Sequence, residues 1–186
     1  MKISSTHRIT AAALLIAIGI AIPMFSPVKI ALEPASFTLA SHVAIFIAMF
    51  IDPIIAVAVA IGATVGFLLS FPIVIALRAA SHLVFVIIGS LYLRRRPDVL
   101  FKPVRVQIFA FLIAIIHAVC EVAVVLAFYF GGSVLQTQYS SIGLVFMLIG
   151  VGSVVHSMVD FEIALVVYRA LCKQKSFASV FLRKAA

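Results

Sequence analysis

The sequence predicts an all-α integral membrane protein with six transmembrane helices and both termini in the cytoplasm. Of its 186 residues, 65% are hydrophobic and only 11% are charged, and the mean hydropathy is +1.31. Soluble domains carry about 25% charged residues, so this composition excludes a soluble protein. Apolar runs long enough to cross a bilayer recur along the whole chain, which predicts a single membrane domain over residues 1–186.

The basic residues predict the orientation of the chain in the membrane. The net charge is +8, and most Lys and Arg residues fall into three groups at the two ends and in one internal loop. Lys and Arg are enriched in cytoplasmic flanks of membrane helices, so all three groups are expected on that side. The basic residues form no aromatic-interleaved face, so nucleic acid is not an expected partner. The groups are Lys2 and Arg8; Arg94, Arg95, Arg96, Lys102 and Arg105; and Arg169, Lys173, Lys175, Arg183 and Lys184.

The first helix is expected over residues 8–24, where Pro23 ends the apolar run. Ala13, Ala17 and Ala21 recur at every fourth position, and small residues at this spacing let another helix approach closely. This face is therefore a candidate contact surface for a partner. The next stretch, residues 25–37, holds Pro27 and Pro34 and is predicted to be an ordered, non-helical loop on the membrane surface.

Three helices are expected between this loop and the internal basic group, over residues 38–51, 54–70 and 72–93. Breaks at Asp52-Pro53 and at Phe71-Pro72 separate them. The first helix takes the chain to the outer side, and the internal basic group is expected back in the cytoplasm, so an odd number of crossings is required here. Residues 38–51 would cover only about 20 Å as a helix, so this segment is expected to be tilted, partial or sheltered by protein.

Two longer helices complete the predicted bundle, over residues 104–130 and 141–172, with a turn at Gly131-Gly132 between them. Three helices each carry a polar pair four residues apart, which places both members on one helix face. A charged side chain inside a membrane helix costs about 2.5–3.5 kcal/mol on insertion scales, and such residues usually serve function. The pairs are Arg78 and His82, His117 and Glu121, and His156 and Asp160.

Counting turns from the helix ends predicts a polar ligand-binding pocket in the outer half of the membrane. Arg78 and Glu121 are expected at one depth as mutual counter-ions that orient the ligand. His156 and Asp160 are expected deeper, toward the cytoplasm, as a contact between helices. The alternative that the sequence leaves open is a structural Arg78–Glu121 ion pair without a ligand, with the histidines as packing residues. The remaining expected pocket residues are His82, His117 and His42, with Phe37 and Ser36 in a covering loop.

No catalytic residues and no metal site are expected. The chain lacks the His-Glu-x-x-His and Gly-x-Ser-x-Gly motifs and any phosphate-binding glycine loop. Cys120 and Cys172 lack the spacing of metal ligands. Three histidines are available as ligands in principle, but no acidic funnel accompanies them, so a metal is not favoured.

In its length, its six predicted helices, the alanine face of the first helix and the long loop before a short second helix, the chain resembles the S-components of energy-coupling factor (ECF) vitamin transporters. The resemblance implies a substrate-capture subunit in the plasma membrane that binds a vitamin from outside under the first loop and topples to release it inside. It implies as partners a membrane coupling subunit, which packs on the alanine face, and two cytoplasmic ATPases. The chain itself would bind no cofactor, because the partners use the ATP.

Among family members, the sequence is most similar to those for hydroxymethylpyrimidine or pyridoxine. Niacin is the close competitor, because Arg78 offers a partner for its carboxylate. A different class of protein also remains open, a stand-alone ion- or proton-coupled carrier that uses the His-acid pairs as a relay. Such carriers commonly show internal repeats of broken helices, and no such repeat is evident in this sequence.

Overall fold

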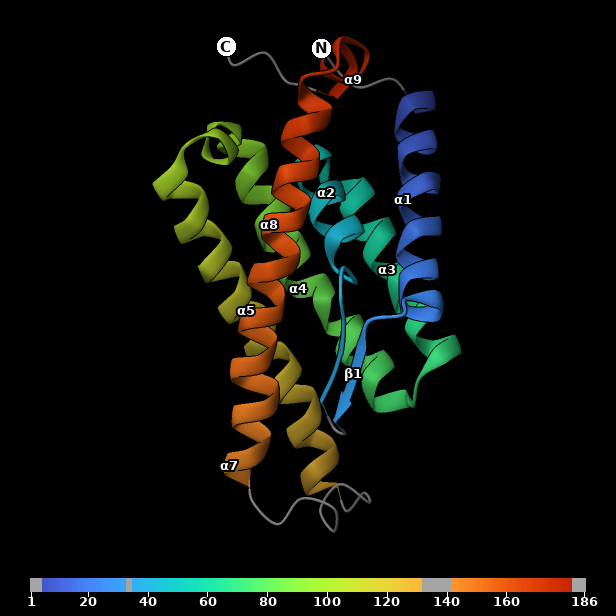
Figure 1. Ribbon diagram of the computed structural model, residues 1–186, viewed down its shortest axis with the longest axis vertical. Coiled ribbons are helices and arrows are strands. Elements are labelled where there is room, and N and C mark those ends of the chain that lie inside the picture. Colours follow the sequence, from blue (N-terminus) through green and yellow to red (C-terminus); the bar gives the residue numbers. More distant parts are fainter. Residues whose placement is uncertain (1–4, 33–34, 132–141, 182–186) are drawn as a thin grey trace.

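The computed structural model describes residues 5–32, 35–131 and 142–181 and shows a bundle of helices with one short β-hairpin (Figure 1). Helices begin and end close to most of the predicted bounds. The helices are α1 (Ser5–Phe25), α2 (Val43–Ile51), α3 (Pro53–Ser70), α4 (Ile73–Arg95), α5 (Pro103–Phe130), α7 (Ile142–Val145), α8 (Gly152–Cys172) and α9 (Lys175–Phe181). A 3-10 turn, η1 (Pro97–Phe101), precedes α5, and a π-helical stretch, η2 (Phe146–Val151), joins α7 to α8.

Within the described residues, five helices are long and apolar enough to cross a membrane: α1, α3, α4, α5 and the continuous stretch of η2 and α8. The second predicted helix, expected over residues 38–51, is shorter than predicted, because α2 has only 9 residues. Nine residues rise about 14 Å, roughly half of a bilayer's hydrocarbon core. Every α2 residue from Ala44 to Phe50 is buried, and Phe46 packs against Phe85 of α4 and Phe161 of α8. The short helix is thus sheltered by protein at the centre of the bundle.

The break between α2 and α3 is made by Asp52 and Pro53, as expected from the sequence. Proline suits the first turn of a helix, where its missing N–H would have no partner in any case. The Asp52 side chain accepts a hydrogen bond from the backbone N–H of Ile54 at 2.9 Å, which caps α3. Asp52 also forms an ion pair with Arg8. This buried carboxylate therefore ties α1 to the junction of two other helices.

The expected loop over residues 25–37 contains regular structure that the prolines did not predict. Strands β1 (Lys29–Leu32) and β2 (Ala35–Thr38) pair antiparallel, with Lys29 opposite Thr38. A turn follows β2, and its residue Ala40 has a positive φ of 67°. Helix α2 consequently starts at Val43 and not near residue 38, because the preceding residues are used by the hairpin and the turn. In Figure 1 the hairpin lies in the lower half of the bundle, below α1 and α2.

Helices α1 and α3 approach closely through glycine. A Cβ atom added to Gly62 would lie 2.7 Å from Ile16 Cγ2, and one added to Gly66 would lie 2.8 Å from the backbone of Ile20. Ala13 and Ala17 lie on another face of α1 and are exposed, while Ala21 is half-buried. The alanine face is thus largely left uncovered by this chain.

The N-terminal end of α1, the turn η1 and helix α9 all lie at one end of the molecule (Figure 1). The described members of the three basic groups lie in or beside these elements. Arg169 of α8 binds the carbonyl oxygen of Leu100 at this end, and Asp98 forms a 2.7 Å ion pair with Lys102. The hydrogen bond from Lys102 lowers the pKa of the exposed Asp98 carboxyl group.

Candidate ligand-binding site

Arg78 of α4 and Glu121 of α5 form a buried ion pair. Arg78 Nη2 lies 3.0 Å from Glu121 Oε2, and only 2% and 5% of the two residues are exposed. The Ser153 hydroxyl of α8 donates to the same carboxylate oxygen. The structure thus brings together the cation and the anion that the sequence analysis paired. It adds Ser153, which lies one helical turn before His156 on the polar face of α8.

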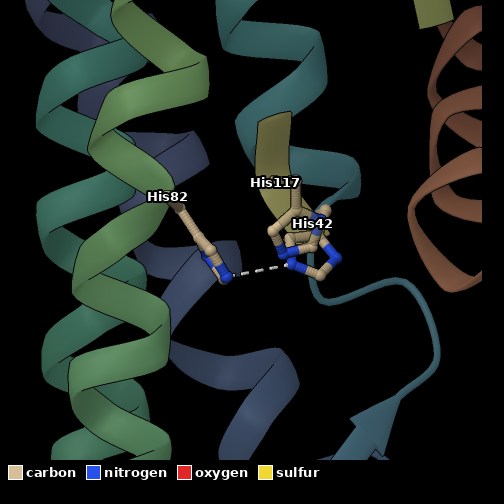
Figure 2. Close-up of side chains that lie close together, drawn as sticks. All are labelled: His42, His82 and His117. Carbon is tan, nitrogen blue, oxygen red and sulfur yellow. Dashed lines mark hydrogen bonds between the residues drawn. The ribbon is translucent and has the colours of Figure 1, made fainter. Parts of the chain in front are cut away.

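Three histidines from three elements meet, as Figure 2 shows. Two of them, His82 and His117, lie 3.4 and 3.5 Å from Glu121 of the ion pair. His42 lies at the start of α2, His82 on α4 and His117 on α5. Their ring centroids are 4.6–4.7 Å apart in every pairing, and all three side chains are buried. His82 and His117 lie on the same helix faces as Arg78 and Glu121, which explains why the cluster and the ion pair adjoin.

His156 and Asp160 join this cluster, so the expectation that they lie apart from the pocket residues is wrong. Asp160 accepts hydrogen bonds from the backbone N–H groups of Ala40 and His42, at 2.8 and 2.9 Å, and His42 Nδ1 lies 3.0 Å from the same carboxylate. The His156 ring centroid is 4.9 Å from that of His42. The hairpin and its turn carry His42 deep into the bundle, and it therefore meets α8 at the level of Asp160.

Phe37 and Ser36 lie on strand β2. The Phe37 ring is 5.5 Å from the His156 ring, centroid to centroid, so the hairpin contacts the polar cluster. A Cβ atom on Gly152 would lie 2.6 Å from Phe37 Cζ, so glycine is required there for the ring to occupy its place. Ser36 pairs with Ala31 across the hairpin, and its side chain lies outside what the structure describes.

A small cavity lies between the hairpin and the charged wall of the site. Its volume is about 20 Å³, and its lining includes Phe37, His42, Arg78, Glu121 and His156. A space of this size holds about one water molecule. His117 does not line the cavity, and Ser41, which sequence reasoning missed, does. Ser41 has no signal in the sequence beyond its position next to His42.

A bundle of membrane-length helices around one arginine, two carboxylates and four imidazoles, all of them buried except the half-buried His156, defines an integral membrane protein with a polar interior site. Over 173 residues, the chain is 42% identical to the protein described as the niacin transporter NiaX of Lactococcus lactis subsp. cremoris (strain MG1363); the match covers 92% of this chain and 78% of that relative. The chain belongs to the same family of vitamin-uptake S-components, and it is a multi-pass transport protein of the plasma membrane and not an enzyme.

Two other comparisons gave no match. No profile of a known family matches the chain, and no solved structure does.

Proposed function

We propose that the chain captures niacin at the outer side of the membrane as the substrate-binding subunit of an ECF transporter. The 42% identity to a niacin transporter supports niacin over hydroxymethylpyrimidine or pyridoxine, the substrates that the sequence resemblance favoured. The observation that carries the proposal is the buried Arg78–Glu121 pair beside a cluster of aromatic nitrogen rings. Niacin, a pyridine ring with one carboxylate, offers a complement to both.

Arg78 is the residue that we propose for the niacin carboxylate. It lies within the membrane-spanning part of α4 and is 2% exposed, so its charge interacts in a medium of low dielectric constant. Arginine binds carboxylates through two parallel hydrogen bonds, which are stronger than hydrogen bonds between neutral groups. A carboxylate ligand would share the Arg78 guanidinium with Glu121 and would be its second negatively charged partner. Hydroxymethylpyrimidine and pyridoxine have no carboxylate and would gain less at this position.

The histidines and Phe37 would bind the pyridine ring. Imidazole N–H groups are suitable donors to the pyridine nitrogen, and tilted aromatic contacts at centroid distances of about 4.5–7 Å are favourable. His42, His82 and His117 present several such surfaces next to Arg78. We also assign Ser36, on the same strand as Phe37, to the covering segment. The ring and the carboxylate of one small molecule would then be recognised on adjoining walls.

Binding requires the cavity to expand, because about 20 Å³ is too small for a pyridine carboxylate. The hairpin is the segment that we expect to move. It contacts the cluster through Phe37, and its two short strands pair only with each other among the described residues. Movement of the hairpin would open a route from the outer surface to Arg78.

Delivery to the cytoplasm would depend on partner subunits. We propose that the exposed alanines of α1, Ala13 and Ala17 with Ala21 beside them, pack against a membrane coupling subunit. Two cytoplasmic ATPases would bind to that subunit and hydrolyse the ATP. In this arrangement the chain crosses the membrane six times with cytoplasmic termini, the short helix α2 counting as one sheltered crossing.

A matched pair of ligands tests the substrate assignment. Nicotinamide has the same ring as niacin but a neutral amide in place of the carboxylate. Titration calorimetry on the purified chain should show niacin binding at least about tenfold more tightly than nicotinamide, since a charge-assisted hydrogen bond is worth roughly 1.5–3 kcal/mol. Equal affinities for the two, or preferential binding of hydroxymethylpyrimidine or pyridoxine, would remove niacin as the proposed substrate.

A second measurement separates the capture subunit from the stand-alone carrier. Proteoliposomes that contain this chain alone should bind niacin without accumulating it, whereas addition of the coupling subunit and ATPases with ATP should give uptake. Uptake by the lone chain that follows an imposed proton gradient would favour the carrier.

A further inference from the structure

The three buried histidines and Glu121 have the spacing of ligands around one metal ion. His42 Nε2 and His82 Nε2 are 3.4 Å apart, and Glu121 Oε1 lies 3.4 Å from His82 Nε2 and 3.5 Å from His117 Nε2. Ligands about 2.0–2.1 Å from a tetrahedral Zn²⁺ ion lie about 3.3–3.4 Å from one another. The ligand atoms of the three histidines all lie within 4.8 Å of each other. Figure 2 shows the rings converging from separate elements.

Asp160 orients His42 as an outer partner orients a metal ligand. The Asp160 carboxylate accepts the backbone N–H groups of Ala40 and His42, and His42 Nδ1 lies 3.0 Å from Asp160 Oδ2. An ionised carboxylate only accepts hydrogen bonds, so Nδ1 carries a proton, and the neutral form of the ring then has its lone pair on Nε2. That lone pair is directed toward His82. Metal-bound histidines commonly donate their second ring N–H group to a carboxylate in this way.

His117 supplies an independent observation. It is fully buried, and neither of its ring nitrogens has a hydrogen-bond partner among the residues that the structure describes. A separation of 3.5 Å from Glu121 Oε1 is too long for an ordinary hydrogen bond. Buried polar groups are normally paired, because an unpaired one costs about 1–3 kcal/mol. A bound cation would pair the nitrogen that faces Glu121.

We propose that His42, His82 and His117 bind one divalent transition-metal ion of the Zn²⁺ type through ring nitrogens, with Glu121 Oε1 as the fourth ligand. Three imidazoles and one carboxylate suit a tetrahedral Zn²⁺ ion, whereas Mg²⁺ and Ca²⁺ prefer oxygen ligands. Glu121 provides a negative charge next to the cation, Asp160 provides a second one on the other side of the His42 ring, and Arg78 offsets one of them through the other oxygen of Glu121. The sequence alone did not favour this site, because no acidic funnel accompanies the three histidines.

The two oxygens of Glu121 face different partners, so the ion and the niacin carboxylate would occupy adjoining positions, while the three histidines would be common to the metal site and to the proposed ring site. Oε1 is the oxygen near His82 and His117, and Oε2 is the oxygen near Arg78 and Ser153. Arg78 therefore stays available to a carboxylate ligand when the ion is bound. The metal site does not depend on the identity of the vitamin.

Metal analysis of the intact chain tests the site directly. The chain should be purified in mild detergent without a polyhistidine tag, stripped with a chelator and loaded with Zn²⁺ or Co²⁺. We expect about one ion per chain after removal of excess metal, and a visible absorption band of tetrahedral Co²⁺. His117→Asn and His82→Asn should each lose the ion and the band. Asp160→Asn should weaken Zn²⁺ binding by about 10–100-fold, the usual effect of removing an outer partner.

His156→Asn is the matched control, because this histidine also contacts His42 but is not among the proposed ligands. It should retain the ion and the Co²⁺ spectrum. Size-exclusion chromatography of each variant checks that metal loss does not reflect unfolding. Failure of the folded wild-type chain to retain either ion would overturn the proposal, and loss of the ion in His156→Asn would overturn the ligand set. Neither result would affect niacin binding by the metal-free chain, which is measured separately.

Discussion

Asp160 holds His42 at the centre of the bundle through two contacts, with the backbone N–H at 2.9 Å and with ring Nδ1 at 3.0 Å. Asp160 belongs to α8, and His42 begins the short helix α2, so the contact joins segments 118 residues apart. Both residues are buried. The carboxylate fixes the orientation of the ring and the position of the turn that follows the hairpin.

Replacing this carboxylate with an amide should therefore lower the stability of the fold, in addition to weakening Zn²⁺ binding at the proposed metal site. Asp160→Asn puts an NH₂ group where one oxygen accepts an N–H group, which leaves a buried donor unpaired at a cost of about 1–3 kcal/mol. For a chain of this size we expect the melting temperature to fall by roughly 2–4 °C for each kcal/mol. Thermal denaturation in detergent measures the shift.

The control for this substitution is Asp98→Asn in the exposed turn η1. Asp98 pairs with Lys102 and Arg105 at the surface, and exposed ion pairs contribute about 0–1 kcal/mol. Its melting temperature should stay close to that of the wild type. An equal loss in both variants would show that the amide at position 160 acts through net charge and not through the contacts with His42.

Helix bounds were predictable where proline and aspartate mark them. Pro53 and Pro103 each occupy the first turn of a helix, and Asp52 caps α3, so local chemistry decides these positions. The pairing of Arg78 with Glu121 followed from counting turns along α4 and α5, which are regular from end to end. Depth is a sound inference along such helices because the rise per residue is constant.

The same count failed for His42 and Asp160 because the intervening structure is irregular. The hairpin places the start of α2 within the bundle, and a π-helical stretch precedes α8. Neither feature has a rise of 1.5 Å per residue over its length. Strand pairing between Lys29 and Thr38 depends on two segments meeting, and the prolines between and before them indicated only that a helix was excluded.

The Arg78–Glu121 pair permits a test of ligand binding against a purely structural role. Arg78→Met should leave a buried, uncompensated carboxylate and destabilise the chain by about 3–5 kcal/mol. The double variant Arg78→Met/Glu121→Gln removes both charges and should regain most of that stability. It should nevertheless bind niacin far more weakly than the wild type in titration calorimetry. A double variant with wild-type affinity would leave the pair with a structural role only.

Phe37 and Gly152 offer a test of the hairpin as the cover of the site. Gly152→Ala places a Cβ atom 2.6 Å from Phe37 Cζ, so the ring must move. Overpacking of this kind costs about 1–3 kcal/mol, which corresponds to an affinity loss of roughly 5–150-fold if the displaced ring closes the occupied site. Niacin titration measures the affinity, and hydrogen exchange over residues 29–38 should become faster.

Gly150→Ala is the matched control on the same segment, because a Cβ atom there meets only Val122 Cγ2 at 3.7 Å. It should leave both the affinity and the exchange of the hairpin unchanged. If Gly152→Ala also leaves both unchanged, the hairpin does not cover the bound ligand through Phe37.

Substitutions at two small residues, Ala17 of α1 and Gly66 of α3, should distinguish an effect on assembly from an effect on folding. Ala17 is exposed, so Ala17→Leu should leave the melting temperature and niacin binding unchanged, while it blocks co-purification with the coupling subunit and abolishes ATP-driven uptake. Gly66→Ala places a Cβ atom 2.8 Å from the Ile20 carbonyl oxygen, a backbone atom that moves only if α1 moves away from α3. This variant should lose about 1–3 kcal/mol of stability before any partner is added. Co-purification of Ala17→Leu at the wild-type level would assign the coupling surface to another face of the chain, whereas a loss of niacin binding in Ala17→Leu would mean that the alanine face serves the fold.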